Sequence, residues 1–183
     1  MTDHELIELY WQRSETAIEE TEREYGRYLH YIADCILHNH EDAQEIVNDT
    51  YLKAWNAIPP ERPDPLRPFL GRITRQLAIN RLERNTADKR GGGQYEAVLD
   101  ELSACVSCEE NVVDRIALRD SINHFLRSLP DLHRRIFIKR YWYLSSIADI
   151  AGQLSVSESR VKSLLMRMRQ KLKKQLIKEG FDV

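Results

Sequence analysis

The sequence predicts an all-α protein of two small helical domains joined by a flexible acidic linker. Three observations predict this class: apolar residues recur three and four positions apart, strand-like alternation is nearly absent, and the 183 residues include only 7 glycines. The predicted boundaries are 1–90 for the first domain, 91–110 for the linker and 111–183 for the second domain, which contains a helix-turn-helix. A chain of this length is long enough to bury a core.

The opening helices are predicted from about Asp3 to Leu37 and are acidic and amphipathic. Their core candidates lie at helical spacing and are Leu6, Leu9, Tyr10, Tyr25, Leu29 and Ile32. His30, His38 and His40 are close in sequence, but no acidic or cysteine partner has ligand spacing. We therefore predict no metal site here.

Another helix is predicted from about Asp42 to Ile58. Its core stripe comprises Ala43, Ile46, Val47, Thr50, Tyr51, Ala54, Trp55 and Ile58. The opposite face carries four residues at spacings of three, four and seven, namely Glu45, Asn48, Asp49 and Leu52. An exposed leucine among acids and an amide suits docking of a basic partner helix, although a solvated face with one stray leucine is the alternative.

A proline-rich loop precedes a basic helix that begins at Leu66. The prolines Pro59, Pro60, Pro63, Pro65 and Pro68 each fix φ and interrupt helix continuation. Phe69, Leu70, Ile73 and Leu77 form the apolar side of the helix, and its arginines are Arg67, Arg72, Arg75, Arg81 and Arg84. A stiff loop beside such a helix could hold an unstacked base while the arginines neutralise phosphates.

The glycine triplet at 91–93 is predicted to be a hinge. It lacks a following Gly-Lys-Ser/Thr and a preceding strand, which excludes a phosphate-binding loop. Residues 94–110 contain acidic residues but no Lys or Arg, as is typical of an extended or partly ordered linker. Cys105 and Cys108 fall here, and one such pair cannot complete a tetrahedral zinc site.

The stretch from Leu144 to Leu176 predicts two helices with a sharp turn between them. Ser157 is placed to cap the second helix by accepting a backbone N–H. The apolar positions of that helix are Val161, Leu164, Leu165, Met168, Leu172 and Leu176, and its cations are Arg160, Lys162, Arg167, Arg169, Lys171, Lys173 and Lys174. A capped turn followed by such a helix indicates a DNA major groove. Upstream, Ser128–Asp131 is interpreted as a capping box that starts a packing helix.

Charge is segregated along the chain, although the net charge is only −2. The net is −9 over residues 1–58, +5 over 66–90, −5 over 91–131 and +10 over 132–178. Two basic blocks with an acidic spacer predict two separate contacts with a polyanion, the alternative being ordinary solvated helix faces. Three cysteines, an odd number, favour a reducing cytoplasm, and no apolar run has membrane-span length.

Three stretches in this order resemble bacterial RNA polymerase sigma factors of the extracytoplasmic-function class. They are DAQEIVNDTYLKAWNAI, RPFLGRITRQLAINRLER and LPDLHRRIFIKRYWYLSSIADIAGQLSVSESRVKSLLMRMRQKL. The resemblance covers nearly the whole chain. It implies a non-enzymatic protein without a cofactor that binds core RNA polymerase and promoter DNA and directs transcription initiation. An anti-sigma factor is a further partner that the sequence leaves open.

The resemblance also implies roles for individual residues. Glu45, Asn48, Asp49 and Leu52 match the positions that dock on the clamp coiled coil of the polymerase's largest subunit. The proline loop and the following helix would capture and help melt the −10 element through Arg67, Phe69, Arg72, Arg75, Gln76 and Asn80. Contacts to the −35 element fall on Arg160, Lys162, Ser163, Met166 and Arg167.

Three other functions remain alternatives at this point. A stand-alone helix-turn-helix regulator would explain residues 132–178 but not the second basic helix. An enzyme would have to use the Cys105 and Cys108 pair. An adaptor that binds polymerase without DNA would not need the cations Lys162 and Arg167.

Overall fold

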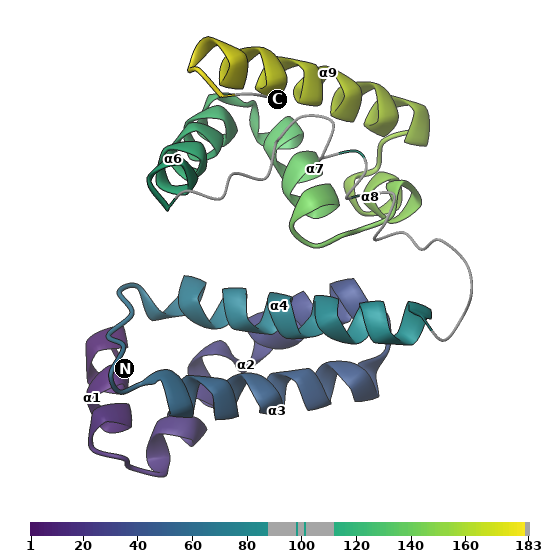
Figure 1. Cartoon of the computed structure of the whole chain (residues 1–183). Coiled ribbons are helices and arrows are strands. Elements are labelled where there is room, and N and C mark those ends of the chain that lie inside the picture. The colour runs from purple at the N-terminus through teal and green to yellow at the C-terminus, as the bar shows by residue number, and fades with distance from the viewer. Residues whose placement is uncertain (88–97, 99–100, 102–111, 182–183) are drawn as a thin grey trace. The chain divides into compact units, whose positions relative to one another are not determined.

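The computed structural model describes residues 1–87, 98, 101 and 112–181, which form two compact units divided between Arg90 and Gly91 (Figure 1). Within these described residues every regular element is a helix, which confirms the predicted all-α class. The predicted glycine hinge at 91–93 and most of the predicted linker lie outside the described residues. Among those described, no helix is both long and apolar enough to cross a bilayer.

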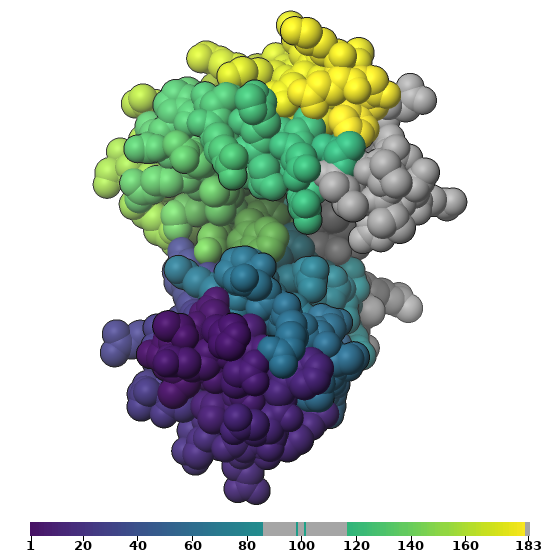
Figure 2. All heavy atoms as spheres, turned by 90° about the vertical axis from the view of Figure 1, so that its left-hand side faces the viewer, coloured from purple at the N-terminus to yellow at the C-terminus, as the bar shows by residue number. Residues whose placement is uncertain are grey.

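The first unit is a bundle of four helices, α1 (Asp3–Trp11), α2 (Thr16–Leu37), α3 (His40–Ala57) and α4 (Leu66–Ala87). Helix α2 packs against both α3 and α4, and α3 and α4 also pack against each other. Helix α1 covers α2 and lies against the start of α4 (Figure 2).

The core of the first unit contains most of the residues that the apolar spacing predicts. Leu6, Tyr10, Leu29 and Ile32 are fully buried, together with the whole predicted stripe of α3 except the half-buried Trp55. Two core candidates, Leu9 and Tyr25, are only half-buried. Further buried residues come from α4, namely Leu66, Leu70, Thr74 and Ala78.

Helix starts in the first unit follow from local capping. Thr2 and Glu5 form a reciprocal capping box at α1, in which each side chain accepts the other's backbone N–H. Asn39 caps α3 by accepting from the backbone of Glu41 and Asp42, so α3 begins two residues earlier than its apolar stripe suggested.

The second unit consists of α6 (Val112–Ser128), α7 (Asp131–Tyr141), α8 (Ile147–Leu154) and α9 (Glu158–Lys178). Helix α9 packs against the other three. The core centres on Phe125 and Phe137, whose rings meet edge to face at 5.6 Å between centroids. Fully buried aliphatic residues complete it, namely Ile136, Ile150, Leu165, Leu172 and Leu176.

The capping box predicted at Ser128–Asp131 is wrong, although a helix does begin there. Helix α7 has Pro130 at its N-cap and no side-chain cap. Ser128 is the last residue of α6, and its hydroxyl donates to the Phe125 carbonyl at 2.7 Å. The Ser128 side chain is thus turned toward a carbonyl of its own helix, as serine often is at a helix end, and it does not cap α7.

Candidate nucleic-acid interface

The turn between α8 and α9 has the predicted geometry. Ser155 ends α8 in the left-handed region, with φ 53°. Ser157 is extended, and its Oγ accepts the backbone N–H of Arg160 at 3.3 Å. The Ser157 cap satisfies one of the N–H groups that have no partner within α9, so the helix begins sharply at Glu158.

The apolar face of α9 is buried as predicted. All six predicted apolar positions have at most 7% of their surface exposed. This face fixes the rotation of the helix about its axis, because the opposite residues must then face away from the core. Leu164 belongs to this buried set, which removes it from any contact with DNA.

The five candidates for the −35 element lie together on the N-terminal half of α9. Arg160, Lys162, Met166 and Arg167 are exposed, Met166 by 49%, whereas Ser163 is half-buried. Lys162 makes only a loose ion pair with Glu158, at 3.9 Å. Within the described part of the chain, Arg160 and Arg167 have no acidic partner, so their charge is available to an external anion.

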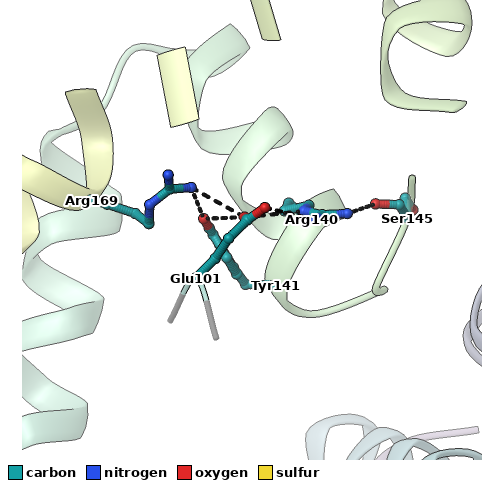
Figure 3. Close-up of polar contacts among 5 residues, drawn as sticks. All are labelled: Glu101, Arg140, Tyr141, Ser145 and Arg169. Atoms are coloured by element: carbon teal, nitrogen blue, oxygen red, sulfur yellow. Dashed lines mark hydrogen bonds and ion pairs between the residues drawn. The ribbon is translucent and has the colours of Figure 1, made fainter. Parts of the chain in front are cut away.

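Arg169 behaves differently from the other cations predicted for this helix. Its guanidinium turns toward α7, where Nη1 donates to the Tyr141 hydroxyl at 2.8 Å and to Glu101 Oε2 at 3.1 Å (Figure 3). Only the exposed cations of α9 can therefore serve as ligands for DNA, and Arg169 stabilises the unit instead.

Glu101 joins α7 and α9 through one carboxylate. Its Oε1 accepts from Arg140 Nη2 at 2.8 Å, and its Oε2 accepts from the Tyr141 hydroxyl at 3.1 Å (Figure 3). Arg140 is 95% buried and also donates to the carbonyl of Ser145, just before α8. The sequence assigned Glu101 to the linker, because only its long-range partners reveal that it belongs to the second unit.

The electrostatics of this cluster favour an ionised Glu101. Burial opposes ionisation, but hydrogen bonds and positive charge from Arg140 and Arg169 outweigh it and lower the pKa of the Glu101 carboxyl. Burial raises the pKa of Tyr141 to about 12, so its hydroxyl stays protonated and can donate a hydrogen bond to the carboxylate.

The exposed face of α4 is cationic, but its arginines rest on aromatic rings. The guanidinium of Arg67 lies 4.4 Å from the centre of the Tyr28 ring, and that of Arg72 lies 5.7 Å from the Phe69 ring. Phe69 itself is only 8% exposed. A buried ring cannot stack on a base, so in this conformation Phe69 supports Arg72 and does not itself offer a contact surface.

The remaining candidates for the −10 element, Arg75, Gln76 and Asn80, lie along the middle of α4. Gln76 is exposed and donates to the half-buried Asn80 at 2.9 Å, so the two amides form a pair one turn apart. Arg75 is half-buried. Arg72, Gln76 and Asn80 recur at four-residue spacing and so follow one face of α4, whereas Arg67 lies in its first turn and Arg75 to one side of that face.

Arg81 is another arginine whose role the sequence did not reveal. It forms ion pairs with Asp42 and Glu45 of α3, each at 2.7 Å. The hydrogen bond and charge of Arg81 lower the pKa of Glu45. Arg81 therefore ties α4 to α3, and Glu45 already has an internal partner.

The predicted docking face of α3 is present on the surface. Leu52 is 58% exposed, Asn48 and Glu45 are also exposed, and Asp49 is half-buried. These residues form a strip along the helix, with an apolar side chain at one end and the Arg81 ion pair at the other.

Comparison with known proteins matches both units to one family. The Sigma-70 region 2 model matches residues 23–87, and the Sigma-70 region 4 model matches residues 119–172. The chain is a sigma factor of the extracytoplasmic-function class. The sigma factor is 26% identical to RNA polymerase sigma factor YlaC of Bacillus subtilis (strain 168), over 84% of this chain and 90% of YlaC.

A second relative from the same strain is the ECF RNA polymerase sigma factor SigW. It is 26% identical, over 83% of this chain and 84% of SigW. Among solved structures, CnrH in complex with the cytosolic domain of CnrY aligns over 98% of this chain and 99% of that one, with 19% identity and a TM-score of 0.44.

The family decides between the functions that the sequence left open. The sigma factor binds core RNA polymerase and promoter DNA and directs promoter-specific transcription initiation; it is not an enzyme. A stand-alone helix-turn-helix regulator would not explain the region 2 match in the first unit, and an adaptor that avoids DNA is excluded for the same family reason.

The sequence contains two groups of possible metal ligands, the histidines of the first unit and the Cys105 and Cys108 pair. Cys105 and Cys108 lie outside the described residues. The rings of His30 and His40 stack at 6.1 Å, and His40 lies 3.6 Å from Asp34. No group of three metal-ligating side chains occurs among the residues described.

Proposed function

We propose that the second unit reads the −35 element through the N-terminal half of α9, and that the first unit captures the −10 element with α4 and the loop before it. The observation that carries this proposal is the division of α9. Its six apolar positions are buried, while Arg160, Lys162, Met166 and Arg167 are exposed behind a capped turn. This is the arrangement that a major-groove helix requires.

At the −35 element, the cations and the smaller side chains have different tasks. Arg160, Lys162 and Arg167 supply charge for phosphates and, through guanidinium donors, for guanine edges. Ser163 and Met166 lie between them on the same face and can contact base edges without adding charge. Contacts to phosphates thus give affinity and register, and contacts to base edges give sequence preference.

At the −10 element, the first unit has to bind unpaired DNA. Extruding a base costs a few kcal/mol, and contacts to the extruded base and to the strand offset part of that cost. Arg67 and Arg72 can neutralise phosphates, Arg75 adds charge, and Gln76 and Asn80 offer amide hydrogen bonds. Melting is then driven by binding energy alone.

The docking surface for core polymerase is the strip of Glu45, Asn48, Asp49 and Leu52 on α3. An exposed leucine beside carboxylates suits a basic partner helix with an apolar stripe. We infer that this contact is made with the clamp coiled coil of the largest subunit, in the cytoplasm. Control by an anti-sigma factor stays a prediction, and co-purification from cells under stress would test it.

Site-specific photo-cross-linking on a promoter mapped with core polymerase tests these assignments. A photoreactive residue at Met166 should cross-link to DNA at −35, one at Gln76 to the non-template strand at −10, and one at Leu52 to the largest subunit. Ile177 is the matched control for Met166, because it is 55% exposed on the same helix but lies three turns further along. Equal DNA cross-linking from Met166 and Ile177 would refute the −35 assignment.

A further inference from the structure

Helix α1 makes three contacts with the loop and the helix start that we assign to the −10 element. Asp3 Oδ2 accepts the backbone N–H of Leu66 at 2.7 Å. Glu8 Oε1 accepts from Arg62 Nη1 at 2.5 Å, and the Arg62 guanidinium lies 4.2 Å from the centre of the Trp11 ring. These contacts link residues more than 50 positions apart in the chain. Helix α1 also lies before the segment matched by the region 2 family.

The Asp3 contact answers a local need of α4. The first N–H groups of a helix have no partner within it, and a residue with a side-chain oxygen usually caps them. Pro65 immediately precedes α4 and has no such oxygen. A carboxylate brought from α1 therefore takes the place of the missing cap, and its negative charge also suits the positive end of the helix.

Asp3 is itself held in place from a second helix. The Tyr25 hydroxyl of α2 donates to Asp3 Oδ1, while Asp3 Oδ2 receives the α4 N–H. The carboxylate is thus fixed between two elements. Its α4 partner Leu66 is fully buried and directly precedes Arg67, whose guanidinium stacks on Tyr28.

Arg62 forms the second point of attachment. Its guanidinium is held between the Trp11 ring and the Glu8 carboxylate, which lie one turn apart on α1. A cation–π contact and an ion pair to the same guanidinium restrict the loop more than either does alone. The two attachment points enclose positions 62–66 of the proline-rich loop.

We propose that α1 braces the −10 loop, with Asp3 and Glu8 acting as positioning residues that hold Leu66 and Arg62 so that Arg67 and Arg72 meet the promoter in a fixed geometry. This inference rests on the proposed −10 role of α4. The residues of α1 need not touch DNA for it to hold. They determine how well ordered the loop is and how strongly the protein discriminates between −10 sequences.

The test uses the full-length sigma factor with core polymerase and three variants. Asp3→Ala removes the cap, and Asp3→Asn keeps an oxygen acceptor. His4→Ala is the control, because His4 is exposed on the same turn. Amide hydrogen exchange of positions 59–70 reports loop order, and fluorescence of 2-aminopurine at −10 reports opening on promoters with matched and altered −10 elements.

Loss of a helix cap typically changes an equilibrium by about fivefold. We expect Asp3→Ala to speed exchange in 59–70 and to reduce opening on the matched promoter by about fivefold, with a smaller loss on the altered one. Discrimination should therefore fall, whereas a variant that merely lowered the folded fraction would leave the ratio unchanged. Asp3→Asn should recover most of the effect, and His4→Ala should behave as the parent protein.

Glu8→Gln provides a second, milder variant in case Asp3→Ala does not fold. It weakens only the Arg62 attachment, and we expect at most about a twofold loss of discrimination because both partners of this pair are partly exposed. If exchange in 59–70 is unchanged in every variant, the brace does not exist.

Arg72→Ala in the same assay separates this inference from the function on which it rests. If Arg72→Ala abolishes opening while Asp3→Ala loosens the loop but leaves discrimination intact, the brace is irrelevant to recognition and the −10 assignment stands. If Arg72→Ala has no effect on opening, the −10 assignment itself is wrong, and the positioning role of α1 is overturned with it.

Discussion

Helices α4 and α9 both present arginines on their solvent sides, but they hold them differently. On α4, Arg67 and Arg72 lie over aromatic rings of the first unit, and Arg81 is paired with two carboxylates of α3. On α9, Arg160 and Arg167 make no ion pair within the described residues, and the helix is secured instead near its middle by the Arg169–Glu101 pair.

The difference indicates where each interface obtains its precision. The α4 arginines have lost rotamer freedom before DNA arrives, so less is lost on binding. Each freely rotating side chain on α9 must be immobilised, at a cost of about 0.5–1.5 kcal/mol. Helix α9 therefore depends on a rigid backbone, and the Glu101 cluster together with the buried apolar face supplies it.

Removing the Glu101 anchor should have the largest effect. In Glu101→Ala, the nearly buried Arg140 loses its carboxylate partner and, among the described residues, keeps the Ser145 carbonyl as its acceptor. We expect the second unit to lose about 3 kcal/mol of unfolding free energy, at the low end for a broken buried pair because Glu101 is 24% exposed. Trp142 fluorescence during urea unfolding, with Trp11 and Trp55 replaced by Phe, measures this unit alone.

Asp131→Ala is the matched control. The Asp131 carboxylate lies 2.7 Å from the Arg134 guanidinium, so this variant also removes the carboxylate partner of an arginine in the second unit. Asp131, however, is 92% exposed. Exposed pairs contribute at most about 1 kcal/mol. Equal losses for Asp131→Ala and Glu101→Ala would mean that Glu101 is an ordinary surface residue, and α9 would then lack the anchor that distinguishes it from α4.

Removing Arg160 and Arg167, the exposed arginines of α9, should have the next largest effect. The double variant Arg160→Ala, Arg167→Ala should lower binding to −35 DNA by at least about 30-fold, because each such contact contributes about 1–3 kcal/mol. The dependence of log affinity on log salt should also become shallower, by up to about 2. Lys178→Ala, at the exposed end of α9, should change neither quantity; a similar loss in this control would indicate non-specific attraction.

The sequence was informative wherever a residue's role depends on near neighbours. The apolar stripe of α9 and the Ser157 cap are both local, and the structure confirms both. The exposed Leu52 on α3 follows from the same helical periodicity. Ser128 shows the limit of local rules, because a hydroxyl at a helix boundary can satisfy either the helix before it or the one after it.

Long-range pairs were not predictable from the sequence. Glu101 meets Arg169 across 68 positions, and Asp3 meets Leu66 across 63. Neither spacing follows from a helical period, so the residues could be assigned only by composition, as a linker acid and an acidic helix start. Phe69 was placed among DNA contacts by resemblance, while its apolar spacing alone had indicated the buried position that the structure shows.

Displacing the Tyr28 ring, on which the Arg67 guanidinium rests, should have a smaller effect. This change tests whether the aromatic rings hold the arginines of α4 in place. A Cβ at Gly71 would lie 2.5 Å from the Tyr28 hydroxyl oxygen, so Gly71→Ala should displace the ring beneath Arg67. Overpacking costs about 1–3 kcal/mol, and the better helix propensity of Ala returns up to about 1. We expect a net loss of up to about 2 kcal/mol in thermal unfolding and weaker −10 binding.

Gly152→Ala is the control for Gly71→Ala. Among the described residues, no atom apart from its own helix backbone and chain neighbours lies within 4 Å of the Cβ position at Gly152, so only the propensity gain applies and the protein should become slightly more stable. If Gly71→Ala also stabilises the protein and leaves −10 binding unchanged, the Tyr28 ring does not preset Arg67, and α4 and α9 hold their arginines with similar freedom.

The smallest expected effect is the acid dependence of the Glu101 anchor. Its pKa is lowered in the folded protein, so its contribution is complete above about 4.5, the ordinary value, and is lost as the pH falls through the lowered folded pKa. The difference in unfolding free energy between the parent and Glu101→Gln, followed by Trp142 fluorescence, should be constant from pH 7 to about pH 5 and shrink below that. Other carboxylates titrate in both proteins and largely cancel. A difference that grew on acidification would mean that Arg140 and Arg169 do not favour the ionised carboxyl, and the anchoring of α9 would then not depend on charge.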